Sequence, residues 1–141
     1  MEEDGELVIG LSTILKLTGA LPAVLGILII IAPETVLAVG PHLNEEGLYL
    51  GLFVGVLALL FGVSHWLVAA YVTENLHVFG RFYVVGHMLI ALIEAYGWLS
   101  GILEFETKYI FGSLLPFTTA FVLLLYSIKP DQTEPVSNIA G

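Results

Sequence analysis

The chain has 141 residues, of which 57% are hydrophobic and 12% are charged. Its charged fraction is about half the value typical of soluble domains and its mean hydropathy is +0.95, so an ordinary water-soluble domain is excluded. The absence of cysteine excludes disulfides, thiolate chemistry, iron–sulfur clusters and cysteine-ligated zinc.

Acidic residues outnumber basic residues by 13 to 4, which is unusual for a membrane protein. Acidic loops repel nucleic acid and anionic lipid headgroups, so no nucleic-acid partner is expected. High cytoplasmic salt, with a screening length of about 3 Å at 1 M, would suit such a surface. The charge balance therefore favours a halophilic archaeon, or one of its viruses, as the source. The alternative is an acidic composition that arose by drift.

Four apolar runs cover about residues 7–31, 48–72, 79–103 and 109–128, and crossing a bilayer takes about 20 residues. Pro22 and Pro116 interrupt the first and fourth runs, which the interior of a helix bundle tolerates. The chain begins with acidic residues, whereas a secretory signal begins with basic ones, so we expect the first run to be a retained span. Residues 32–47 are predicted to form a loop with one short interfacial helix, and residues 130–141 a flexible tail.

Short links after the second and third runs force neighbouring helices to run antiparallel. The predicted fold class is therefore all-α, an integral membrane four-helix bundle of up-down-up-down topology that forms one domain over residues 1–129. Arg81 and Lys129 lie on the side of the termini, and Lys108 lies on the other side. The positive-inside rule thus favours a cell-membrane location with both termini in the cytoplasm.

Glycine strips are expected on two of the predicted helices. One of these glycines directly precedes the second span, three lie in it and two lie in the third: Gly47, Gly51, Gly55, Gly62, Gly97 and Gly101. Small residues spaced by four let another backbone approach closely, so these positions are predicted to pack helices within the bundle or against another copy. We therefore expect a homo-oligomer or a membrane partner subunit. The alternative is that glycine is simply common in membrane helices.

Polar residues occur at a similar depth in all four predicted spans: Lys16, His65, His87, Thr118 and Thr119. Counted from the side of the termini, they lie roughly 10–14 Å deep at a rise of about 1.5 Å per residue. Glu94, near the middle of the third span, is expected about 10 Å deeper and within about 20° of His87 on one helix face. A carboxylate exposed to lipid there is costly, so this face must meet another helix, a cavity, a cofactor or a partner subunit.

Several chemistries fit this predicted polar layer. His65 and His87 could hold the iron of haem b from both sides, as in membrane cytochromes. Lys16, the two histidines and Glu94 could instead bind a quinone headgroup or pass protons. Each residue also has a purely structural interpretation, in which no cofactor is bound. Water would then reach the histidines, the Lys16 ammonium would extend to the headgroups, and Glu94 would be a protonated acid hydrogen-bonded across helices.

The order of features resembles the DoxX-like group of small four-helix membrane proteins. The likeness covers most of the chain and rests on the glycine-rich first span ending in Ala32-Pro33-Glu34, the glycine-lined second span and Arg81 at the start of the third. The first span departs from the group's pattern because it lacks the arginine often found at its start. The resemblance implies a bundle that works beside a quinone-linked or redox partner, and it assigns no reaction or catalytic residue.

The sequence has no phosphate loop, dinucleotide fingerprint, HExxH or Gly-x-Ser-x-Gly motif, so it indicates no enzyme class. The leading expectation is a small integral membrane protein that acts as a non-catalytic subunit or scaffold. The first alternative is a membrane redox protein that binds quinone or haem. The second is a small proton-coupled carrier or channel in which Glu94 is the titrating group.

Overall fold

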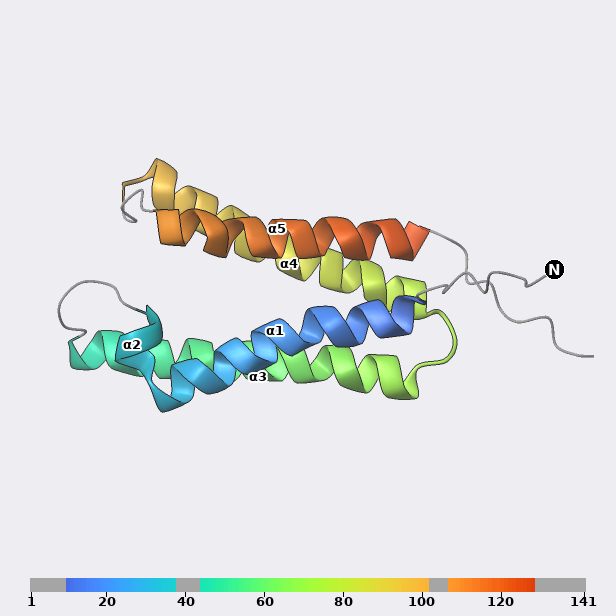
Figure 1. The fold of residues 1–141 in the computed structure, drawn as a ribbon, viewed down its shortest axis with the longest axis horizontal. Helices are drawn as coiled ribbons and strands as arrows, with labels where there is room; N and C mark the ends of the chain where they lie inside the picture. Colours follow the sequence, from blue (N-terminus) through green and yellow to red (C-terminus); the bar gives the residue numbers. More distant parts are fainter. Residues whose placement is uncertain (1–9, 38–43, 102–106, 129–141) are drawn as a thin grey trace, which may run out of the picture. The chain divides into compact units, whose positions relative to one another are not determined.

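The computed structural model describes residues 10–37, 44–101 and 107–128. They form the helices α1 Leu11–Ile31, α2 Pro33–Leu37, α3 Glu45–Tyr71, α4 Leu76–Leu99 and α5 Thr107–Ile128 (Figure 1). No strand occurs in these three ranges, so the prediction of an all-α protein is confirmed for them. The predicted tail over residues 130–141 lies outside the described residues.

Three of the helices, α1, α3 and α4, are long and apolar enough to cross a membrane. Their 21 to 27 residues correspond to lengths of roughly 31–40 Å at 1.5 Å per residue, against a hydrocarbon core of about 30 Å. These lengths support the predicted membrane location. In α5 the apolar stretch with described side chains, Leu114–Ile128, is shorter than a full span. The fourth crossing therefore stays a prediction.

The helix ends follow from local capping chemistry. Helix α3 begins at Glu45 because the Asn44 side chain accepts a 2.8 Å hydrogen bond from the Gly47 backbone N–H. Helix α4 ends at Leu99, and two residues later Gly101 takes a φ of +74°, a backbone conformation that favours glycine. The short helix α2 confirms the helical piece predicted within residues 32–47. Helix α1 runs through Pro22 without a break.

The chain divides into two compact units, residues 1–79 and 80–141. The first unit contains α1, α2, α3 and the start of α4, and α1 lies alongside α3 in it (Figure 1). The second contains the rest of α4 together with α5. The core of the first unit lies where α1 meets α3, because that contact buries small residues of both helices.

Helices α1 and α3 pair in an antiparallel register that repeats every seven residues. At one end the Ser12 hydroxyl donates a 3.0 Å hydrogen bond to the Ala69 carbonyl. Seven residues further along α1, Gly19 faces Gly62, which lies seven residues back along α3. After seven more residues, Gly26 faces Gly55 in the same way. The pair is therefore held at three levels by small residues on both helices.

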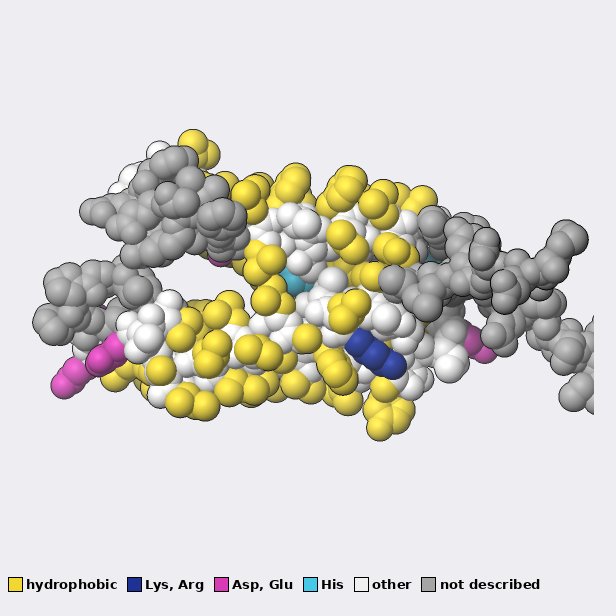
Figure 2. All heavy atoms as spheres, in the orientation of Figure 1, with side chains coloured by type: hydrophobic (Ala, Val, Ile, Leu, Met, Phe, Trp, Pro, Cys, Tyr) yellow, Lys and Arg dark blue, Asp and Glu magenta, His cyan; other side chains and the backbone are white. Residues whose placement is uncertain are grey.

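The outward surface of this helix pair is apolar. Figure 2 shows hydrophobic side chains over most of the visible face, and exposed examples include Leu17 and Val24 on α1 and Phe53 on α3. Such a continuous apolar surface would be unfavourable in water and is suited to contact with lipid or another membrane protein. The burial pattern thus agrees with a membrane protein whose small residues face inward.

Candidate functional site

The backbones of α1 and α3 approach each other closely at Gly19 and Gly62. A Cβ atom placed on Gly62 would press on the Ala23 backbone nitrogen and would lie 2.5 Å from the Gly19 carbonyl oxygen. A Cβ atom placed on Gly19 would lie 2.7 Å from the Gly62 carbonyl oxygen and 2.5 Å from the His65 Cβ. Carbon atoms do not tolerate separations below 3.0 Å, so only glycine fits these two positions without moving the helices apart.

The second close level lies at Gly26 and Gly55. A Cβ atom on Gly26 would press on the Leu59 backbone nitrogen and lie 2.6 Å from the Gly55 carbonyl oxygen. A Cβ atom on Gly55 would instead meet side-chain atoms, with the Ile29 Cγ2 at 2.9 Å. Backbone atoms cannot rotate away, whereas an isoleucine side chain can. Gly26 and Gly62 are thus the more demanding positions.

The six predicted packing glycines fall into different places. Gly55 and Gly62 lie between α1 and α3, Gly51 is buried on α3, and Gly97 is buried on α4. Gly47 is half-buried in the first turn of α3.

Gly101 requires a correction, because it lies beyond the end of α4 and is exposed. A Cβ atom there would meet no described atom within 4 Å. Its positive φ shows that it terminates the helix rather than packing against another one.

The partner glycines on α1 were not among the predicted packing residues. The signal that could have found them is the seven-residue spacing from Gly19 to Gly26, which equals that from Gly55 to Gly62. In an antiparallel pair, equal spacings let the small positions meet at two levels at once. Small residues spaced by four within one helix indicate that another backbone can approach, but they do not identify which helix approaches.

His65 lies in this interface and is completely buried. Its Nδ1 lies 2.8 Å from the Phe61 carbonyl oxygen, one turn back along α3. A carbonyl can only accept, so Nδ1 carries the hydrogen and Nε2 holds the lone pair of the neutral ring. The Phe61 ring meets the imidazole edge to face at 4.7 Å between ring centres. His65 thus has a structural role in holding α3 against Gly19.

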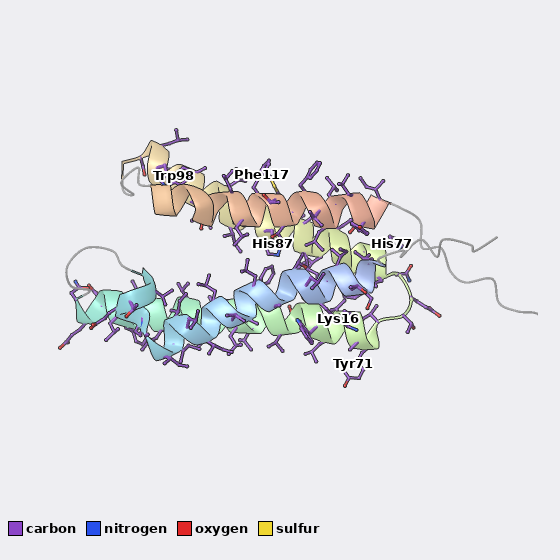
Figure 3. The ribbon with its side chains drawn as sticks, in the orientation of Figure 1. Lys16, Tyr71, His77, His87, Trp98 and Phe117 are labelled. Carbon is purple, nitrogen blue, oxygen red and sulfur yellow. The ribbon has the colours of Figure 1, made fainter. Side chains whose placement is uncertain are left out.

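Lys16 shares a level with His65 but not a site. Four residues separate Lys16 from Ser12 and four separate His65 from Ala69, so the Ser12–Ala69 contact places both at the same height. However, Lys16 is exposed on α1 (Figure 3). His65 is fully buried. Lys16 is the sixth residue of α1, roughly 7.5 Å from the helix start, so its long side chain can extend to the headgroup region.

Helix α4 carries several polar groups on its buried side, whereas Arg81 and Tyr96 are exposed. His87 is 4% exposed and Tyr83 is 3% exposed. Glu94 is half-buried, its Oε2 atom is inaccessible to solvent, and no described residue makes a hydrogen bond to that atom. Trp98, one turn beyond Glu94, also has its ring nitrogen buried (Figure 3).

Glu94 lies nearer to the end of its helix than it does in the predicted span 79–103, while its depth in a membrane stays a prediction. Helix α4 runs from Leu76 to Leu99, so His87 lies at its middle. Glu94 lies five residues before Leu99, roughly 7.5 Å from that end of the helix. The prediction placed Glu94 near the centre because it extended the third span to residue 103.

Helix α5 separates its two threonines. Thr118 is exposed, and its hydroxyl donates a 2.7 Å hydrogen bond to the Leu114 carbonyl of the same helix. Thr119 is half-buried. The buried polar residue on this helix is Ser127, whose hydroxyl bonds to the Leu123 carbonyl at 2.7 Å. Thr118 therefore does not belong to the inward side of α5, and Ser127 is a buried group that the sequence analysis missed.

The predicted polar layer is divided between the two units, with Lys16 and His65 in the first and the other members in the second. Its convergence into one site therefore stays a prediction. Within the described ranges, no group of three or more histidine, aspartate or glutamate side chains is placed to hold a metal ion.

Comparison with known proteins adds no assignment. No protein-family model matches the chain, and neither a curated protein nor a solved structure matches it. The resemblance to DoxX-like proteins thus continues to rest on the residues quoted in the sequence analysis.

Proposed function

We propose that this protein is a small, non-catalytic integral membrane subunit or scaffold, and that its rigid element is the α1–α3 pair. The observation that carries this proposal is the meeting of the two helix backbones at Gly19 and Gly62 and again at Gly26 and Gly55. Chemistry at a site needs accessible polar groups, whereas these positions serve contact alone. His65 also supports this role, because it is buried against α1 and bonded to its own helix.

The physics of helix association in lipid favours such an element. Lipid tails are as apolar as leucine side chains, so helices in a membrane associate through close packing and hydrogen bonds. Glycine lets the backbones approach until dispersion and weak Cα–H···O contacts become effective. A pair held at three levels moves as one body, and its apolar outer surface is offered to lipid or to another subunit.

The proposal includes the four-span bundle with both termini in the cytoplasm. Helix α5 has 22 residues, a length of about 33 Å at 1.5 Å per residue, which suffices for a fourth crossing. Four crossings place both ends of the chain on one side. The partner is a second copy or another membrane subunit, consistent with the predicted oligomer.

The test is the composition of the complex released from native membranes. Two differently tagged copies are co-expressed, extracted in mild detergent and analysed by native mass spectrometry. We expect more than one chain per complex in a fixed stoichiometry. A lone chain at every expression level would overturn the proposal. An absorption spectrum with a Soret band, or extraction of a stoichiometric quinone, would replace it with the redox alternative.

A matched pair of variants links the assembly to the helix pair. Gly26→Ala places a Cβ atom against the Leu59 backbone, whereas a Cβ on the exposed Gly10 meets nothing within 4 Å among the described atoms. We expect Gly26→Ala to reduce the assembled fraction and Gly10→Ala to leave it unchanged. If the two variants assemble to the same extent, then assembly does not depend on the packing of α1 against α3.

A further inference from the structure

Helix α4 carries a polar face that the scaffold role does not use. It consists of Tyr83, His87, Glu94 and Trp98, which lie within about 60° of one another at 100° per residue. The two small residues between them, Ala91 and Gly97, are buried as well.

The opposite face of α4 consists of exposed apolar side chains. Phe82, Leu89 and Ile93 are 66%, 55% and 71% exposed. A helix with apolar residues outward and ionisable residues inward is typical of membrane proteins that carry ions or protons, because charge is costly against lipid.

The polar face extends over much of the helix length. Tyr83 lies roughly 10 Å from the start of α4 at Leu76, and His87 lies midway along the helix. Glu94 lies close to the other end. The face thus places a hydroxyl, an imidazole and a carboxyl in sequence along the helix axis. Side chains of all three kinds take part in proton transfer in proteins.

Glu94 is the group that a purely structural role explains least well. Its Oε2 is shielded from solvent and has no hydrogen-bond partner among the described residues. A buried oxygen without a hydrogen-bond partner is unfavourable, and more so when it is charged. Besides Tyr83, His87 and Glu94, the ionisable side chains in the described part of the second unit are the exposed Arg81 and Tyr96 and the half-buried Tyr126 of α5.

We propose that the polar face of α4 carries protons across the membrane, with Glu94 as the acceptor near the Leu99 end and His87 as the central relay. A proton from water converts the Glu94 carboxylate to the acid. The acid returns a proton through water to one ring nitrogen of His87, and the ring releases a proton from its other nitrogen to water beside Tyr83, which leads to the opposite side of the membrane. One proton has then moved, the carboxylate is restored, the imidazole is neutral in its other tautomer until a ring flip or proton exchange resets it, and no electron is transferred.

Water is required between the two main groups. Seven residues separate His87 from Glu94, roughly 10 Å along the helix, which two or three water molecules would bridge. Ala91 lies between them and contributes only a methyl group on this face. The proposal therefore needs hydration of this face, not direct contact between the two side chains.

The test is proton flux into liposomes that contain the full chain and a trapped pH-sensitive dye, driven by a potassium diffusion potential. We expect Glu94→Gln and His87→Gln each to lower the protein-dependent flux at least tenfold. Glu74→Gln, which changes an exposed acid before α4, should leave the flux unchanged. Wild-type flux equal to that of empty liposomes, or Glu94→Gln flux equal to wild type, would overturn the proposal.

Tyrosine provides a matched control within α4. Tyr83→Phe removes a hydroxyl from the polar face, and Tyr96→Phe removes one from the exposed face, where Tyr96 is 65% exposed. We expect Tyr83→Phe to lower the flux severalfold and Tyr96→Phe to have no effect. Equal flux in both variants would remove Tyr83 from the path.

A measurement on the unaltered protein covers the case in which the Glu94 variant does not fold. A hydrophobic carbodiimide reacts with carboxylic acids in apolar surroundings, and peptide mass spectrometry locates the adduct. We expect modification at Glu94 ahead of Glu74, with loss of flux in proportion to the modified fraction. Full modification of Glu94 with unchanged flux would refute the path. The number of chains per complex, which tests the proposed scaffold role, is measured separately and does not depend on either outcome.

Discussion

Gly62→Ala tests the α1–α3 contact most directly. The new Cβ atom would lie 2.5 Å from the Gly19 carbonyl oxygen and would press on the Ala23 backbone nitrogen. A carbon and a carbonyl oxygen approach to about 3.3 Å at best, so the helices would have to separate by about 0.8 Å. Both neighbours are backbone atoms, so no side-chain rotation can relieve the contact.

The cost of Gly62→Ala can be worked from two opposing terms. Overpacking in a well-packed interior costs about 1–3 kcal/mol, and the upper half applies here because backbone must move. The higher helix propensity of alanine returns about 1 kcal/mol. We therefore expect the free energy of unfolding to fall by about 1–2 kcal/mol.

The assay is a titration with SDS in mixed micelles, followed by the fluorescence of Trp66. This residue borders the contact, because a Cβ atom on Gly19 would lie 3.1 Å from its ring. A Trp98→Phe background leaves Trp66 as the single tryptophan reporter, since the chain has two tryptophans. The midpoint of the transition then reports the separation of α1 from α3.

Gly55→Ala is the matched control, with the same chemical change on the same helix. Its Cβ atom would meet only side-chain atoms, with the Ile29 Cγ2 at 2.9 Å and the Ile30 Cγ1 at 3.1 Å, so a smaller shift relieves the contact than at Gly62. We expect a smaller loss of stability than for Gly62→Ala, because the helix propensity gained offsets part of the overpacking. Equal losses at Gly55 and Gly62, or no loss at Gly62, would refute the argument that backbone contact sets the cost.

Three further predictions use the same titration. Ser12→Ala removes the hydrogen bond to the Ala69 carbonyl and should cost about 0.5–1 kcal/mol, the usual value across membrane helices, so an unchanged midpoint would mean that the bond does not contribute. Lys16→Met should change stability by less than about 0.5 kcal/mol because the side chain is exposed, and a larger loss would place its ammonium in a buried contact. Asn75 has a φ of 56°, in the left-handed region. Asn75→Val should therefore lower the free energy of unfolding by about 1–2 kcal/mol, while Asn75→Gly should be tolerated. Equal stability of the two variants would contradict the left-handed conformation.

The positions of the helices could be predicted because they depend on local properties. A run of apolar residues matched to the bilayer thickness predicts a helix wherever it occurs, and α1, α3 and α4 all lie within a few residues of the predicted spans. The short helix α2 likewise begins at a proline, Pro33, in a segment of mixed polarity. The ends of the helices were less predictable, because the caps at Asn44 and Gly101 depend on single residues.

The candidate site could be predicted only in part. His87 and Glu94 share one face of α4 as expected, since seven residues are nearly two helical turns. Lys16 and His65 lie at the same level, yet their side chains are not brought together. The level depends on position along the helix axis, whereas burial depends on the direction in which a side chain points around that axis. Thr118 lies on the exposed side of α5 for the same reason.

The amino-acid sequence by itself determined that this is a helical membrane protein, because composition and the length of apolar runs decide that in lipid. Only the tertiary structure decided which glycines meet. Gly19 with Gly62 and Gly26 with Gly55 form a register between segments more than 25 residues apart, and no local pattern in either helix names its partner. The tertiary structure likewise decided that His65 is buried and Lys16 is exposed at the same level. A side chain becomes buried or exposed only when a second helix covers one side of its own helix.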